Sequence, residues 1–77
     1  MENKNPIQVA DRLFGAVEYL AANGPSGLIE IATALGLNKS TTHRILRSLH
    51  YLGYVEQDDT TGKYQLTSRL EAIITSK

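Results

Sequence analysis

Residues 28–52, LIEIATALGLNKSTTHRILRSLHYL, decide the fold of this chain. Two helical patterns meet at Gly36 with almost nothing between them. Glycine takes the positive φ that reverses a chain after a helix, whereas a residue with a Cβ does so only at about 1 to 2 kcal/mol. Ala32 supplies a small side chain where two helices cross, and Leu37 turns back toward the core. The stretch is therefore predicted to be a helix-turn-helix.

The second of these helices, about residues 39–52, has two different faces at helical periodicity. The mostly apolar face collects Thr42, Ile45, Leu46, Leu49 and Leu52. The opposite face carries Ser40, His43, Arg44, Arg47 and Tyr51. Asn38 is a good N-cap, and Lys39 in the first turn fits beside a phosphate better than beside a bare helix N-terminus. This pattern is typical of a helix that reads DNA.

Composition limits the remaining possibilities. With 77 residues and 42% hydrophobic content, the chain is long enough for one small domain. It has no cysteine, which excludes disulfides, thiolate metal sites and a cysteine nucleophile. No apolar run approaches the roughly 20 residues that cross a bilayer, and MENKNPIQ lacks a signal-peptide centre. We expect no membrane partner and a cytoplasmic location.

The charges are unevenly distributed. A formal net charge of zero argues against a polyanion-binding surface. Between Glu30 and Glu56, however, the only formal charges are Lys39, Arg44 and Arg47. The acids gather elsewhere, at Asp11, Glu18, Glu56, Asp58 and Asp59. One basic face is predicted; the alternative is an ordinary solvated helix face.

The N-terminal part is expected to support the helix-turn-helix. Residues 1–7 are predicted to be a flexible arm. Residues 9–23 are predicted to be a helix that closes the core through Val9, Leu13, Phe14, Val17, Leu20 and Ala21. Gly15 marks close packing. Arg12 is a candidate phosphate contact, with an ion pair to a nearby carboxylate as the alternative. Ser26 or Gly27 caps the next helix.

After Leu52 the pattern changes from helix to strand. Gly53 ends the helix, residues 54–57 and 63–66 read as two strands, and residues 58–62 read as their turn. Val55, Tyr64 and Leu66 are expected to face inward. Thr61, Gly62 and Lys63 could reach a DNA backbone, while Glu56, Asp58 and Asp59 would be repelled, so wing contact stays open.

Residues 67–77 are predicted to start a further helix, capped by Thr67 or Ser68. Its apolar residues, Leu70, Ile73 and Ile74, have little left in the chain to pack against. They indicate a linker helix to a missing domain, or a dimer contact. The expected architecture is mainly α with a small β-hairpin: a winged helix-turn-helix over residues 8–66, with three helices and a two-stranded wing.

Three segments carry a family resemblance: LGLNKSTTHRIL at 35–46, LGYV at 52–55 and TGKYQL at 61–66. Over nearly its whole length the chain resembles the N-terminal DNA-binding domain of IclR-family transcriptional regulators. It differs at Asn38, where proline is usual, at Thr42, usually aliphatic, and at Thr67, frequently glycine. None of these changes removes a DNA-facing group.

The resemblance implies binding to double-stranded operator DNA by a homodimer or tetramer, in the cytoplasm of a bacterium or archaeon and with the nucleoid when bound. A small-molecule effector would bind only through a C-terminal domain that these residues do not contain. The family's contacts fall on Lys39, Ser40, Thr41 and Arg44. The helical wheel adds His43 and Arg47, and Arg12 and Lys63 complete the candidate set.

The side-chain chemistry of these residues indicates which of them would contact bases and which would contact phosphates. The Arg44 guanidinium matches the N7 and O6 acceptors of guanine. Lys39 and Arg47 suit phosphates, although Arg47 could also be a solvated charge. Ser40, Thr41 and His43 could bind a base or a phosphate.

Other functions fit less well. His43 and His50 stand two helical turns apart, roughly 10 Å along the axis, too far to share a zinc ion. Ser40 and His43 lie on a convex helix surface without a pocket, so no catalytic, metal or cofactor site is predicted. The main rival is a winged-helix protein-interaction module without DNA binding. It would predict an exposed apolar patch in place of Arg44 and Arg47.

Overall fold

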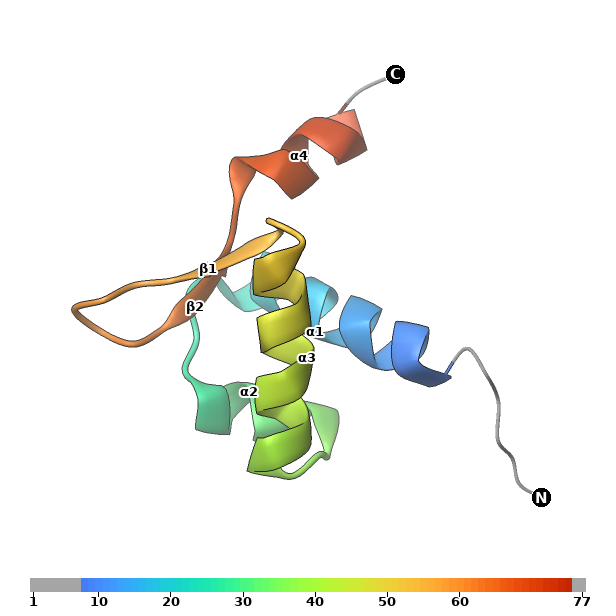
Figure 1. Cartoon of the computed structure of the whole chain (residues 1–77), viewed down its shortest axis with the longest axis vertical. Coiled ribbons are helices and arrows are strands. Elements are labelled where there is room, and N and C mark those ends of the chain that lie inside the picture. The colour runs from blue at the N-terminus through green and yellow to red at the C-terminus, as the bar shows by residue number, and fades with distance from the viewer. Residues whose placement is uncertain (1–7, 76–77) are drawn as a thin grey trace.

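The computed structural model describes residues 8–75, apart from the side chains at positions 71, 74 and 75. The expected arm at residues 1–7, the last two residues and the Ile74 side chain lie outside the described part. The elements in chain order are α1 (Gln8–Asn23), α2 (Leu28–Leu35), α3 (Lys39–Tyr51), β1 (Val55–Gln57), β2 (Tyr64–Leu66) and α4 (Ser68–Thr75). Figure 1 shows α3 in front of α1, with the β-hairpin projecting to one side.

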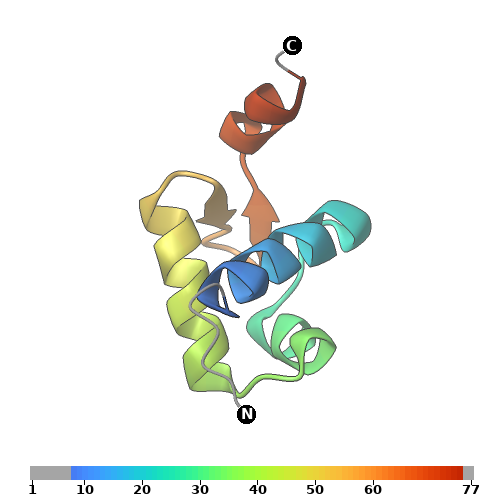
Figure 2. The ribbon, with the colours of Figure 1, turned by 90° about the vertical axis from the view of Figure 1, so that its right-hand side faces the viewer.

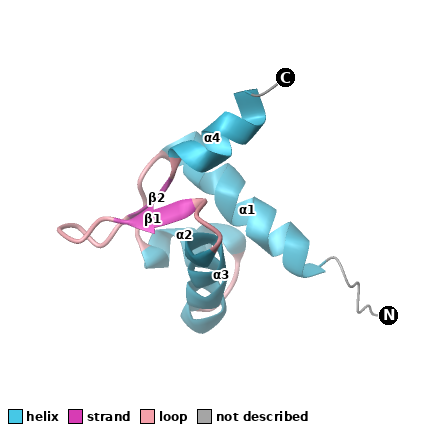
Figure 3. Cartoon of the chain, turned by 45° about the horizontal axis from the view of Figure 1, so that its top comes forward, coloured by secondary structure: helices cyan, strands magenta, loops and turns pink. Residues whose placement is uncertain are grey.

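The predicted winged helix-turn-helix is confirmed. Helices α1, α2 and α3 gather around one core, while α4 stands apart at the far end of the molecule (Figure 2). β1 and β2 form an antiparallel pair in which Val55 faces Leu66 and Gln57 faces Tyr64. Figure 3 shows this hairpin extending well beyond the helices. No helix among the described residues is long and apolar enough to cross a membrane.

The core joins all three helices to the hairpin. Its buried apolar residues are Ala16, Leu20, Ile31, Ala32, Ile45, Leu46, Leu49, Val55 and Tyr64. Thr42 is also fully buried, and its hydroxyl donates to the carbonyl oxygen of Asn38 at 2.9 Å. A buried hydroxyl with a partner avoids the penalty of an unsatisfied polar group. The threonine is therefore compatible with the core.

Local chemistry forms the turn between α2 and α3 as predicted. Gly36 has φ 68°, and the amide of Leu37 donates to the carbonyl oxygen of Ala32 at 3.0 Å. The Asn38 side-chain oxygen accepts from the Thr41 amide at 2.8 Å. Both helix ends are therefore closed by short-range hydrogen bonds. At the start of α2 the cap is Gly27, whose amide donates to the Glu30 carboxylate at 2.8 Å.

The predicted inner face of α1 is partly wrong. Val9 and Phe14 are 62% and 65% exposed, and Ala21 is exposed as well. Ala16, which the spacing did not single out, is fully buried. Phe14 lies two residues from Ala16, about 200° around the helix, so the two cannot face the same core. Leu52 also differs from the expectation: it is the C-cap of α3 and is 48% exposed.

Gly15 shows the close packing that its position indicated. A Cβ added there would lie 3.2 Å from the Cδ2 atom of Leu35. This contact brings α1 near to α2, and it leaves little space for a larger residue.

Two connections fasten the ends of the hairpin. Ser26, before α2, pairs with Tyr64 through amide-to-carbonyl bonds of 3.0 and 2.8 Å, an extension of the sheet that we did not predict. Thr67 donates its hydroxyl to the Gly53 carbonyl oxygen at 2.6 Å. The Arg69 guanidinium lies 5.3 Å from the centre of the Tyr54 ring. Helix α4 therefore begins from an anchored position.

Candidate nucleic-acid interface

The exposed face of α3 holds most of the predicted DNA-binding residues. Lys39, Ser40, His43, Arg44 and Arg47 are all exposed, and Thr41 is half-buried. The opposite side of the same helix carries the buried residues, which fix α3 against α1 and α2. The rotation of α3 about its axis is thereby set by the core, and its polar face is turned to solvent.

The cations on this face are not neutralised. Within residues 8–75, and leaving aside the undescribed side chains, no carboxylate pairs with Lys39, Arg44 or Arg47. Solvated side chains of this kind are available to bind phosphates and base edges. The basic face that the charge distribution predicted is therefore present as a surface of one helix.

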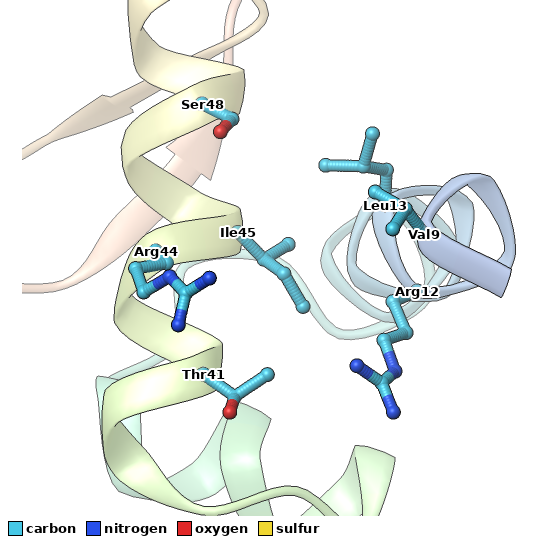
Figure 4. A pocket seen from close by; sticks show the side chains of 7 residues that line it. All are labelled: Val9, Arg12, Leu13, Thr41, Arg44, Ile45 and Ser48. Carbon is cyan, nitrogen blue, oxygen red and sulfur yellow. The ribbon is translucent and has the colours of Figure 1, made fainter.

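A hollow of about 170 Å³ separates α1 from α3. Figure 4 shows Arg12 reaching into it from α1, opposite Arg44 and Thr41 on α3. The remaining lining residues are Val9, Leu13, Ile45 and Ser48. Arg12 makes no ion pair with a described carboxylate, so the alternative considered for it is not observed there. The fold thus brings Arg12, already a candidate, next to the candidates on α3.

A second hollow, of about 190 Å³, lies between α3 and the hairpin. Its lining includes His43, Arg47 and His50 from α3 and Gln57 and Asp59 from the hairpin. His50 was missing from the predicted set, although its spacing from His43 places both on the same side of the helix. Sequence periodicity could therefore have identified it.

The hairpin turn explains one of the acids that counted against wing contact. The Asp58 side-chain oxygen accepts from the amides of Thr60 and Thr61 at 2.7 and 3.1 Å. Asp58 therefore shapes the turn through one of its two carboxylate oxygens. Lys63 is exposed next to this turn and lines neither of the two hollows described above. It stands apart from the α3 candidates.

Exposed apolar side chains lie both beside the arginines of α3 and in a separate groove, and Tyr51 lines a shallow hollow together with Arg47. Tyr51 is 88% exposed at the C-terminal end of α3. A groove of about 290 Å³ between α1, α3 and α4 is lined by Leu13, Phe14, Val17, Leu49, Leu52, Tyr54, Leu70 and Ile73. In the described part of the chain, no three His, Asp or Glu residues are grouped to hold a metal ion.

Comparison with known proteins places these features in context. The sequence-family model of the IclR helix-turn-helix domain matches residues 9–59 of this chain. The chain is 57% identical over 65 residues to the glycerol operon regulatory protein of Streptomyces coelicolor, covering 83% of the chain and 26% of that protein. It is 33% identical over 70 residues to the HTH-type transcriptional regulator KdgR of Escherichia coli, covering 88% and 27%. The chain thus spans about a quarter of the length of these curated relatives.

Two solved structures show the same architecture. An IclR transcriptional regulator from Alicyclobacillus acidocaldarius superimposes with a TM-score of 0.81 and 29% identity, covering 92% of the chain and 28% of that protein. A Zalpha domain from Carassius auratus PKZ, solved in complex with Z-DNA, superimposes with a TM-score of 0.73 and 27% identity, covering 77% and 97%. The matches support a winged helix and extend to a protein bound to DNA.

Proposed function

This chain belongs to the IclR family through its helix-turn-helix domain, and we propose that it binds double-stranded operator DNA in a sequence-specific manner. The observation that carries this proposal is the exposed, unneutralised cationic face of α3. An α-helix of about 10 to 12 Å diameter fits the B-DNA major groove, which is about 12 Å wide. Inserting α3 would bring its polar face to the base edges and its ends to the phosphates.

We assign roles by position and chemistry. Lys39, at the N-terminus of α3, binds a phosphate together with the positive end of the helix dipole. Arg44, in the middle of the exposed face, reads a base edge, while Arg47 binds a phosphate. Ser40, Thr41 and His43 contact bases or phosphates. Lys63 approaches the backbone from the hairpin.

The interaction-module alternative is less well supported. It required an apolar patch in place of Arg44 and Arg47, whereas both arginines are exposed on α3. The exposed apolar groove lies between α1, α3 and α4 instead. An apolar groove there is compatible with DNA binding by the exposed polar face of α3, because Arg44 and Arg47 do not line the groove.

Binding to duplex DNA over a salt series tests the proposal. We expect log affinity to fall linearly with log salt, and Lys39→Ala to flatten the slope by about 0.9 because one phosphate contact is lost. Arg69→Gln removes the same charge from α4, at the other end of the molecule, and should leave the slope unchanged. Absence of duplex binding by the unaltered chain at low salt would refute the function.

We further propose that the regulator acts as a homodimer or tetramer, with the apolar groove between α1, α3 and α4 covered by a second copy. Phe14 and Ile73 line this groove while 65% and 54% exposed. Full burial of a fully exposed side chain of this kind is favourable by about 1.5 to 3 kcal/mol, and covering these two partly exposed ones would contribute part of that each. A symmetric pair would also present two α3 helices to two half-sites about 34 to 36 Å apart.

Sedimentation at increasing concentration tests this contact. Phe14→Ser should weaken self-association at least about tenfold, because the substitution acts twice in a two-fold interface. Val9→Ser is the matched control, since Val9 is 62% exposed but lies outside this groove. Equal behaviour of the two variants, or a chain that stays monomeric throughout, argues against the dimer contact.

We place the regulator in the bacterial cytoplasm, associated with the nucleoid when bound, because the relatives from Streptomyces coelicolor and Escherichia coli are bacterial transcriptional regulators. We assign the domain no enzymatic activity, in keeping with those relatives. Its role needs no cofactor. Any small-molecule effector would act through a separate domain.

A further inference from the structure

The hollow between α1 and α3 has a charged rim over an apolar floor. Ile45 in the floor is only 7% exposed, and Leu13 beside it is half-buried. The polar lining consists of Arg12, Thr41, Arg44 and Ser48, and the exposed Val9 completes the rim. A partly enclosed site beside low-dielectric side chains strengthens the field of the charges at its edge.

Two guanidinium groups line this hollow without a counter-anion. In the described structure, the side chains of Arg12 and Arg44 have neither an ion pair nor a hydrogen bond, and the hydroxyls of Thr41 and Ser48 donate none. Figure 4 shows the Arg12 guanidinium extending along the hollow toward the Thr41 end of α3. Like charges facing one space repel each other, and an anion placed between them removes that repulsion.

The position of the hollow relative to α3 indicates which anion it takes. Thr41, Arg44, Ile45 and Ser48 form the flank of α3 that faces α1. His43, Leu46, Arg47 and His50 form the other flank, toward the hairpin. A helix lying in the major groove has a phosphate backbone on each side of it. When α3 lies in the major groove, the hollow between α1 and α3 is therefore beside one phosphate backbone of the duplex, and the hairpin is beside the other.

We infer that this hollow receives one phosphate of the DNA backbone, bound by Arg12 of α1 and by the Thr41 hydroxyl of α3. The inference rests on the proposed function. The Arg12 guanidinium suits a phosphate because its planar donors bind two oxygens at once. Arg44, on the opposite wall, contributes positive potential and keeps its donors for a base edge. The contact ties α1 to the backbone and sets the register of α3 in the groove.

The inference is tested by measuring the affinity of the whole 77-residue chain for two duplexes over a salt series. One duplex is selected from random sequences for tight binding, and the other is a scrambled version of it. Arg12→Gln should flatten the salt slope by about 0.9 and weaken both complexes by the same factor, so that their affinity ratio is kept. Arg12→Lys should restore the slope because it restores the charge. Arg69→Gln is the matched control and should leave the slope unchanged. Thermal unfolding of each variant verifies the fold.

Duplexes with one neutral methylphosphonate localise the contact. One position should weaken the unaltered chain but leave Arg12→Gln unaffected, since both changes remove the same interaction. The inference is overturned if Arg12→Gln keeps the slope of Arg69→Gln while the unaltered chain binds DNA, or if every methylphosphonate weakens both proteins equally. If the unaltered chain binds neither duplex at low salt, the proposed function itself fails.

Discussion

Leu46→Ala is expected to reduce the free energy of unfolding by about 2 to 5 kcal/mol. Leu46 is fully buried in the cluster that joins α3 to Leu20 of α1, Ile31 of α2 and Val55 of β1. Removing the isopropyl end of its side chain leaves a cavity that these three elements cannot all close. A chain of this size has a total stability of only about 4 to 12 kcal/mol, so this loss is a large fraction of the total.

Urea denaturation followed by far-ultraviolet circular dichroism measures this loss. Leu52→Ala deletes the same atoms from a residue that is 48% exposed, and it should change the unfolding free energy by less than about 1 kcal/mol. Leu46→Met keeps the volume and should lower stability by less than about 1.5 kcal/mol. Similar values for Leu46→Ala and Leu52→Ala would show that Leu46 does not hold the elements together.

Sequence reasoning succeeded where the controlling interactions are local. Gly36 and Asn38 act on amides and carbonyls within five residues, so their chemistry could be predicted without the rest of the fold. The hairpin followed from the change of period after Leu52 and from the turn residues at 58–62. These signals depend on neighbours along the chain, which the sequence displays directly.

Prediction failed where long-range packing decides. The apolar pattern of α1 contains more residues than one face can hold, and only the docking of α1 selects Ala16 over Phe14 for burial. The pairing of Ser26 with Tyr64 joins segments that are distant in sequence. Neither could be derived from a local pattern, because each depends on where other elements lie.

The candidate site likewise contains a part that local sequence patterns predict and a part that depends on long-range packing. Residues on one helix could be grouped by periodicity, and the exposure of Lys39, Arg44 and Arg47 agrees with that grouping. The approach of Arg12 to Thr41 and Arg44 depends on the crossing of α1 and α3, which no spacing in the sequence encodes. The DNA-binding roles of all these residues stay predictions until binding is measured.

Arg44→Ala is expected to reduce sequence discrimination, measured as the affinity ratio between a selected duplex and a scrambled one, by about 5- to 150-fold. This range corresponds to the 1 to 3 kcal/mol by which one bidentate base contact favours the correct base. Arg44 is exposed on α3, where it lines the hollow between α1 and α3, and it has no carboxylate partner in the described structure. Its donors are thus free to meet the N7 and O6 atoms of a guanine.

Two further variants separate base reading from charge. Arg47→Ala removes an equal charge from the same helix and should weaken both complexes alike, leaving the ratio intact. Arg44→Lys keeps the charge but loses the planar fork, so it should restore affinity for the scrambled duplex without restoring discrimination. If Arg44→Ala instead flattens the salt slope by about 0.9 with the ratio preserved, Arg44 binds a phosphate and the base contact belongs to another residue of α3. Arg12 and Arg44 would then be rival ligands of the same phosphate, because both line one hollow, and the salt slopes of Arg12→Gln and Arg44→Ala would have to be compared.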